Sequence, residues 1–200
     1  MSCTSSYLTN ALHFNLIKKN VKGIVARLKI LGIEFDGIAF TGMSGALVAP
    51  LVADKMKKKL LMVRKDGDGS HSSYAVEGHR DVKRYIVLDD LICTGASVRN
   101  VVKGILKMRH NYELTGLECV GVFCWYERYF DVDNCVTNFR IPDSYTDGSK
   151  MKDVPRFQCI AVDKISDAEE ETLMAWAENN KPAPTHIPLS LAAAVMDGRL

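Results

Sequence analysis

Two adjacent carboxylates, Asp89 and Asp90, directly follow a short apolar run at residues 85–88. Ionised carboxylates only accept hydrogen bonds, so a pair of them suits a ligand with neighbouring hydroxyl groups, such as the diol of a ribose. Ligands of open α/β sheets bind outside the carboxyl ends of the strands, where these acids are expected to lie. The pair therefore predicts a sugar-binding site, and the alternative is that the two acids only end a strand.

A small hydroxyl-containing segment, formed by Thr94, Gly95, Ala96 and Ser97, opens a helical pattern just after the acids. The first N–H groups of a helix lack backbone partners, and the helix dipole favours an anion beside them. Gly95 lets the backbone approach a phosphate closely, and the hydroxyls of Thr94 and Ser97 add donors. The segment predicts a cradle for a monophosphate, and the alternative is that Thr94 only caps the helix. It is not a P-loop, because no lysine follows the glycine.

Short apolar runs alternate with helical patterns around these residues. Strands are expected at residues 37–41, 60–63, 85–88 and 119–125. Helical spacing of apolar residues predicts helices over most of the first thirty residues, over 46–56 and over 96–110. Continuous apolar strands that alternate with helices indicate a parallel sheet covered on both faces. We therefore expect an α/β fold, a Rossmann-like parallel sheet flanked by helices, in a single domain over residues 1–200.

Three stretches lack such a pattern. Residues 66–83 are polar and contain several glycines, as expected of a lid or a binding loop, with a local ribbon possible near Tyr74. Residues 126–157 are irregular and polar, and we expect a variable insertion there, followed by a last strand near residues 157–162. The prolines of residues 181–200 indicate an extended C-terminal arm.

The chain has 200 residues, of which 26 are basic and 24 acidic, for a formal net charge of +2. This balance argues against a nucleic-acid partner recognised through bulk charge. No apolar run approaches the roughly 18 residues of a membrane span, and the polar start does not resemble a signal peptide. The six cysteines form no Cys-x-x-Cys pair, which argues against a zinc site. Their even number permits disulfides, but Cys119 and Cys159 lie in apolar runs typical of a core, which favours reduced, buried thiols. We therefore expect a cytoplasmic protein with neither a nucleic-acid nor a membrane partner.

Residues 86–97 resemble the ribose-phosphate signature of the type I phosphoribosyltransferases: an apolar strand, two acids, three spacers and then Thr-Gly-x-Ser. The resemblance extends over about residues 37–125, the expected core. In that family the acids hold the ribose hydroxyls of phosphoribosyl pyrophosphate (PRPP), and the loop holds its 5′-phosphate. The resemblance implies transfer of ribose 5-phosphate from PRPP to a nitrogen acceptor, usually a nucleobase, with release of pyrophosphate.

The resemblance also implies roles for residues outside the signature. Those expected to bind pyrophosphate follow two earlier strands and are Thr41, Gly42, Met43, Ser44, Arg64 and Lys65. The expected catalytic set is Asp89, Asp90 and Lys65. We expect no side chain to act as a direct metal ligand, since Mg²⁺ would be carried by PRPP near the two acids. Family members commonly form homodimers, so the resemblance favours a homodimer here.

Residues 66–83 lie where the family has its mobile lid, with His71, Tyr74 and Glu77 as the expected lid residues. The spacing of Tyr74 and Glu77 resembles an element of adenine phosphoribosyltransferases, whereas a lid histidine is typical of orotate members. Cys93 stands where hypoxanthine-guanine members tend to carry Asp, adenine members Ala and orotate members Thr, so the acceptor base stays open. Aromatic residues from Trp125 onward are candidates for stacking on a base, with ordinary packing as the alternative.

An alternative function of another class is a PRPP- or nucleotide-binding regulator that keeps the fold and has lost turnover. Residues 66–73 contain no lysine, which favours the regulator. The two acids, the Thr-Gly-x-Ser loop and the cations at positions 64 and 65 favour the enzyme.

Overall fold

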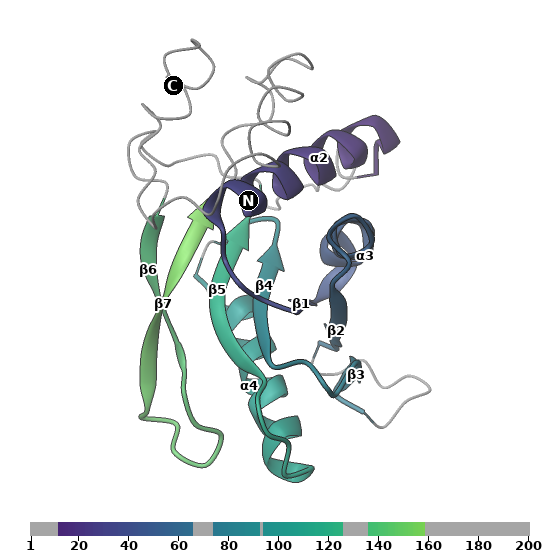
Figure 1. Cartoon of the computed structure of the whole chain (residues 1–200). Helices are drawn as coiled ribbons and strands as arrows, with labels where there is room; N and C mark the ends of the chain where they lie inside the picture. Colours follow the sequence, from purple (N-terminus) through teal and green to yellow (C-terminus); the bar gives the residue numbers. More distant parts are fainter. Residues whose placement is uncertain (1–11, 66–73, 93, 126–135, 159–200) are drawn as a thin grey trace, which may run out of the picture.

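The structure, a computed structural model, describes residues 12–65, 74–92, 94–125 and 136–158 (Figure 1). The helices are α2 (Phe14–Leu31), α3 (Gly42–Met56) and α4 (Ala96–Asn111). The strands are β1 (Gly37–Phe40), β2 (Lys59–Val63), β3 (Val76–Gly78), β4 (Arg84–Asp89), β5 (Glu118–Cys124), β6 (Val136–Pro142) and β7 (Met151–Gln158). No helix of the described residues is long and apolar enough to cross a membrane.

All described strands belong to one sheet with the order β3-β2-β1-β4-β5-β7-β6. The strands β2, β1, β4, β5 and β7 are parallel neighbours, and the edge strands β3 and β6 run antiparallel to them. The predicted α/β fold with a parallel sheet is therefore confirmed. Because β2, β1 and β4 are adjacent, the segments that follow their carboxyl ends lie at one edge of the sheet.

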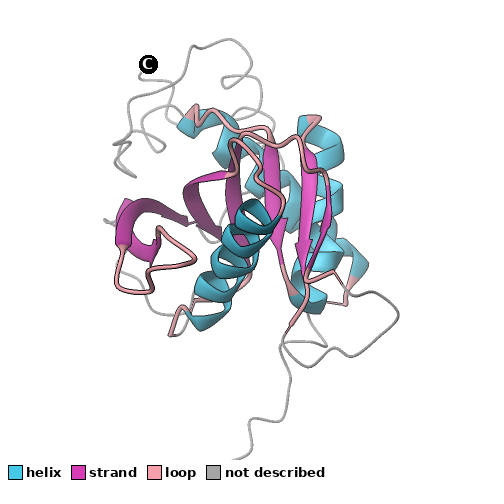
Figure 2. Cartoon of the chain, turned by 90° about the horizontal axis from the view of Figure 1, so that it is seen from below, coloured by secondary structure: helices cyan, strands magenta, loops and turns pink. Residues whose placement is uncertain are grey.

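Helices cover both faces of the sheet, as the two views in Figures 1 and 2 show. The apolar side of α4 packs with Val87 and Val122 in one core, and α2 and α3 pack with Ile86 and Phe123 in the other. Neighbouring residues of β4 thus point to opposite cores, which explains the unbroken apolar sequence of this strand. Gly104 permits the close approach of α4, because a Cβ there would lie 2.8 Å from Val63 Cγ1.

The expectation of an irregular insertion at residues 126–157 is wrong for residues 136–142 and 151–157, since β6 and β7 form a hairpin that extends the sheet beside β5. Phe139 and Ile141 are buried while Asn138 and Arg140 are exposed, the alternation of a strand with one covered face. The many polar and proline residues of the segment obscure this alternation in the sequence. The last strand begins at residue 151, and residues 159–162 lie outside the described part.

The polar loop expected over residues 66–83 also contains a strand, because β3 pairs antiparallel with β2. Helix α3 begins at Gly42 rather than at residue 46, so the glycine-containing segment after β1 forms the first turn of the helix. Residues 66–73 and the expected C-terminal arm at 181–200 lie outside the described residues.

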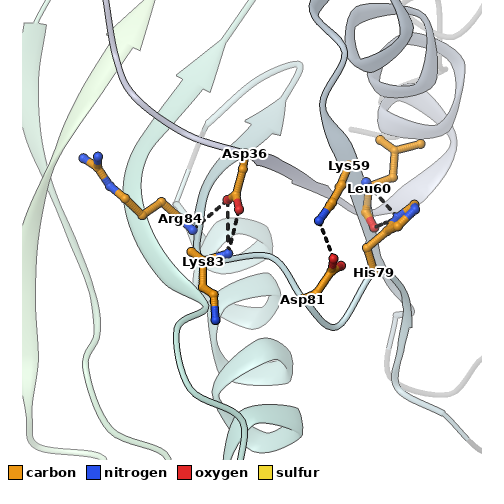
Figure 3. Close-up of polar contacts among 7 residues, drawn as sticks. All are labelled: Asp36, Lys59, Leu60, His79, Asp81, Lys83 and Arg84. Carbon is orange, nitrogen blue, oxygen red and sulfur yellow. Dashed lines mark hydrogen bonds and ion pairs between the residues drawn. The ribbon is translucent and has the colours of Figure 1, made fainter.

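Polar contacts fix the opposite edge of the sheet, where β1, β2 and β4 begin (Figure 3). The Asp36 carboxylate accepts hydrogen bonds from the N–H of Lys83, at 2.9 and 3.1 Å, and from the N–H of Arg84 at 2.8 Å. Lys59 forms an ion pair with Asp81. Burial acts to raise the pKa of Asp36, but the backbone donors of Lys83 and Arg84 and the charge of Lys59 together outweigh it and leave the pKa below its usual value. These contacts hold the strand starts in register, which aligns the strand ends where the candidate site lies.

Candidate functional site

Of the predicted site residues that the structure describes, those expected to bind the ribose and the phosphates follow the carboxyl ends of β2, β1 and β4. Phe40, the last residue of β1, pairs with Met62 of β2, and Ala39 pairs with Val87 of β4. The chain then leaves each strand within two residues of these pairs. The structure therefore places the segments after residues 40, 63 and 88 side by side, as the resemblance requires.

The two acids differ in their surroundings. Asp89 is 7% exposed, and its Oδ1 accepts the Asp90 N–H at 3.0 Å. Asp90 is less buried, and its Oδ1 accepts the Leu91 N–H at 2.9 Å. Burial raises the pKa of Asp89 to about 7, the negative charge of Asp90 adds to the rise, and the charge of Lys65 opposes it. Near neutral pH this pair can both accept hydrogen bonds and, through a protonated Asp89, donate one.

The phosphate-cradle segment lies at the amino end of α4. Gly95 is the N-cap residue with a φ of 74°, and the Ala96 N–H donates to Thr94 Oγ1 at 3.3 Å. Thr94, Ala96 and Ser97 are exposed, so the start of the helix is open to a ligand. Unpaired N–H groups at an open helix start can bind a phosphate.

The segment after β1 is attached to β2 by a hydrogen bond from Thr41 Oγ1 to the carbonyl of Val63 at 2.7 Å. Gly42 begins α3 with a φ of 70°, and a Cβ there would lie 3.3 Å from Lys65 Nζ. Met43 is exposed and Ser44 is half-buried. The Lys65 ammonium group therefore lies beside the amino end of α3, so a cation and a helix start can act on one anion.

Arg64 is held by Glu77, a residue that the sequence places in the lid. Its Nη2 and Nε atoms lie 2.6 and 2.9 Å from Glu77 Oε1, and its N–H donates to the Ala75 carbonyl at 2.9 Å. These contacts join the ends of β2 and β3. Tyr74 is exposed beside Arg80, whose guanidinium carbon lies 5.6 Å from the ring centre. His71 lies outside the described residues, and the lid role of these three residues stays a prediction.

Among the candidates for base stacking, Trp125 is 7% exposed and packs in the core beneath α2 and α3. The backbone N–H of Trp125 donates to the backbone carbonyl of Asp89 at 3.3 Å, so the backbone of this residue supports the acidic pair. Tyr126, Tyr129 and Cys93 lie outside the described residues. The observed burial of Trp125 agrees with ordinary packing.

Two residues of the β6–β7 hairpin, Phe139 and Arg156, lie near the site. The sequence alone did not single out Arg156, and it identified Phe139 only as one of the aromatic candidates for stacking on a base. Phe139 contacts the loop at Gly95. Arg156 is 9% exposed, and its positive charge acts on the thiol of Cys124, the last residue of β5. Burial raises the pKa of this thiol to about 12, and Arg156 opposes the rise. The signal for the hairpin in the sequence is the short alternation of apolar and polar residues at Phe139, Arg140 and Ile141, which the polar residues around it obscure.

The carboxylates of Asp89 and Asp90 fit a magnesium ion that takes most of its ligands from a bound phosphate compound and from water. Carboxylate oxygens of Asp89 and Asp90 are the hard ligands that Mg²⁺ prefers, and the ion often takes its other ligands from phosphates and water. Within the described ranges, no group of three or more His, Cys, Asp or Glu side chains is placed to bind a metal.

Comparison with known proteins places this geometry in a family. A family model described as PRTase-CE matches residues 2–143. An orotate phosphoribosyltransferase of Staphylococcus aureus is 25% identical over 172 residues, which cover 84% of this chain and 79% of that protein. An orotate phosphoribosyltransferase of Archaeoglobus fulgidus is 34% identical over 89 residues, or 42% of this chain and 47% of that protein.

Among solved structures, an adenine phosphoribosyltransferase from Saccharomyces cerevisiae aligns with a TM-score of 0.47 and 17% identity, covering 78% of this chain and 85% of that chain. The family model covers well over half of the 200 residues and includes all the predicted site residues. The chain therefore belongs to the PRTase-CE family, among the type I phosphoribosyltransferases.

Proposed function

We propose that this protein transfers ribose 5-phosphate from PRPP to a ring nitrogen of a nucleobase and releases pyrophosphate. One observation carries the proposal, which is the set of groups that follow three adjacent strands. Lys65 follows β2 and lies beside the helix start that follows β1, while the acidic pair and the open phosphate cradle follow β4. PRPP presents the matching groups, a diol, a pyrophosphate and a 5′-monophosphate, on one small molecule.

Each part of the site has a role in this reaction. Asp89 and Asp90 hold the ribose hydroxyls and stabilise the positive charge that develops on the ring as pyrophosphate leaves. Lys65 and the first turn of α3 neutralise the departing pyrophosphate. The loop at residues 94–97 holds the 5′-phosphate, which fixes the reacting carbon in position. No covalent intermediate with the protein is needed.

Magnesium is the cofactor that fits this assignment. Bound with PRPP near Asp89 and Asp90, Mg²⁺ would supply charge neutralisation to the leaving pyrophosphate. The acids would position the ion and the ribose, while Lys65 adds a fixed positive charge beside the start of α3. We expect pyrophosphate release to be lost in chelator and restored by added Mg²⁺.

Orotate is the first acceptor to test, since the curated relatives reported above carry that name, and adenine is the second. The assay measures pyrophosphate release from PRPP and Mg²⁺ with each of a panel of nucleobases. Release with one base, lost in the double variant Asp89→Asn with Asp90→Asn, supports the transferase. PRPP-dependent thermal stabilisation without release for any base contradicts it and supports the regulator.

We also propose a homodimer, formed through the outer face of α3. Met43 is 63% exposed and Leu51 is 42% exposed, and both share one side of the helix with the half-buried Leu47. Apolar residues spaced by four on an uncovered helix face favour packing against another helix. Light scattering of the wild-type protein and of Leu51→Glu tests this assembly: a dimer that dissociates in the variant supports it, and a wild-type monomer contradicts it.

A further inference from the structure

The β6–β7 hairpin reaches the phosphate cradle through one aromatic side chain, Phe139. A Cβ atom on Gly95 would lie 2.8 Å from Phe139 Cε2, so the ring fills the space against the loop backbone. Phe139 is 9% exposed and belongs to the core between α4 and the sheet. A ring fixed in a packed core offers the loop a rigid surface on which to rest.

Arg99, in the first turn of α4, connects the same ring to the beginning of the loop. Its Nη2 donates a hydrogen bond to the carbonyl of Thr94, and its own N–H donates to the carbonyl of Gly95 at 3.0 Å. The guanidinium carbon lies 5.5 Å from the centre of the Phe139 ring, within the range of a cation–π interaction. Arg99 therefore contacts the loop and the ring that supports it.

These contacts form a closed set, which we call the loop clamp: Phe139 against Gly95, Arg99 over Phe139, and Arg99 bonded to Thr94. A phosphate is bound well only when several N–H donors point at it together, and a loop that must first be ordered loses binding energy to entropy. The clamp orders the loop before the ligand arrives.

We propose that Phe139 and Arg99 are positioning residues for the 5′-phosphate, so that the β6–β7 hairpin is a working part of the binding site. The inference rests on the proposed function and adds two residues to it that are not among the residues predicted to bind the phosphates or the ribose. Neither residue needs to touch the substrate. Both act by holding residues 94–97 in the conformation that binds.

Calorimetric titration with two separate probes tests the loop clamp. Ribose 5-phosphate carries the monophosphate and the diol, whereas magnesium pyrophosphate carries neither. Arg99→Met removes a hydrogen bond from a charged donor. We expect it to lower the affinity for ribose 5-phosphate about tenfold and to leave the affinity for pyrophosphate unchanged. Phe139→Leu is expected to act in the same direction. Arg99→Lys keeps a cationic donor and should recover part of the affinity.

Two matched controls separate the clamp from general loss of charge or packing. Lys103→Met removes an exposed cation one turn further along α4, and Ile141→Val trims a buried residue two positions along β6. Both should bind ribose 5-phosphate like the wild type.

The outcomes distinguish the clamp from the proposed function. Wild-type affinity for ribose 5-phosphate in both Arg99→Met and Phe139→Leu overturns the clamp. An equal loss of affinity for ribose 5-phosphate and for pyrophosphate also overturns it. If Phe139→Leu does not fold, the comparison of Arg99→Met with Arg99→Lys tests the clamp. A wild-type protein that binds neither probe overturns the proposed function and, with it, the inference.

Discussion

The ammonium group of Lys65 lies against Gly42, so that a Cβ atom at residue 42 would come within 3.2 Å of Cε and 3.3 Å of Nζ. Gly42 is the first residue of α3, and the charge of Lys65 also acts on Asp89. A single cation thus reaches the helix start and the acidic pair. Its position depends on the absence of a side chain at residue 42.

Gly42→Ala is expected to displace Lys65 and to strain a backbone that has a φ of 70°. We expect the free energy of unfolding to fall by about 1 kcal/mol, because an L side chain is disfavoured at this φ. Pyrophosphate affinity should fall about tenfold, as expected when a charge-assisted contact is displaced. Gly148→Ala is the matched control, since a Cβ there meets nothing within 4 Å. Wild-type pyrophosphate affinity in Gly42→Ala would show that Lys65 does not bind this anion.

Asp89 is expected to make the protein less stable as the pH rises. Its pKa is about 7 in the folded state, mainly because of burial, against about 3.9 for an exposed carboxyl group. Between these values the folded state binds more protons than the unfolded state, so stability falls from pH 4 to pH 7 and the full penalty remains above pH 7. Asp89→Asn removes the penalty.

We therefore expect Asp89→Asn to be more stable than the wild type at pH 8, by on the order of 2 kcal/mol, and to lose this advantage towards pH 4. Urea unfolding at both pH values measures the difference. The same variant should lose activity, because the amide cannot carry the negative charge that stabilises the transition state. A stability difference that does not change with pH would contradict a raised pKa.

Glu77→Gln is expected to strengthen anion binding at a small cost in stability. The carboxylate of Glu77 neutralises Arg64 at a partly exposed position, with exposed side-chain fractions of 37% and 21%. Partly exposed ion pairs contribute about 1 kcal/mol or less, so the melting temperature should fall only slightly. Without that negative charge, pyrophosphate should bind more tightly at low salt, and the gain should shrink at high salt. Weaker binding in Glu77→Gln would instead mean that the pair orients Arg64 for the ligand.

Asp36→Ala is expected to lower stability without altering the chemistry of the site. It removes the acceptor of the N–H groups of Lys83 and Arg84 at the far edge of the sheet. Loss of hydrogen bonds to a charged acceptor costs about 2 kcal/mol. Because the pKa of Asp36 is lowered, its contribution is present above the unfolded pKa and is lost as the pH falls through the folded pKa. Denaturant unfolding measures the loss, and a large rise in KM for PRPP in the folded variant would contradict a purely structural role.

Most of the parallel core was predictable, because β1, β2, β4 and β5 are unbroken apolar runs and α4 has clear helical spacing. The hairpin of β6 and β7 could not be predicted in the same way, since a strand with one face in the core needs apolar residues only at alternate positions. In β6 these are Phe139 and Ile141, too few to stand out among polar neighbours. The short strand β3 forms within a polar segment because β2 supplies its hydrogen-bond partners.

By itself, the sequence determined the local chemistry: two acids at the end of a strand, followed by a glycine at the start of a helix. These features depend on residues close together in the chain, where spacing and propensity decide the backbone. Only the tertiary structure decided that Lys65 lies beside Gly42, that Glu77 holds Arg64 and that Phe139 supports the loop at Gly95. Each of these contacts joins different strands or helices, so it follows from the order and register of the sheet.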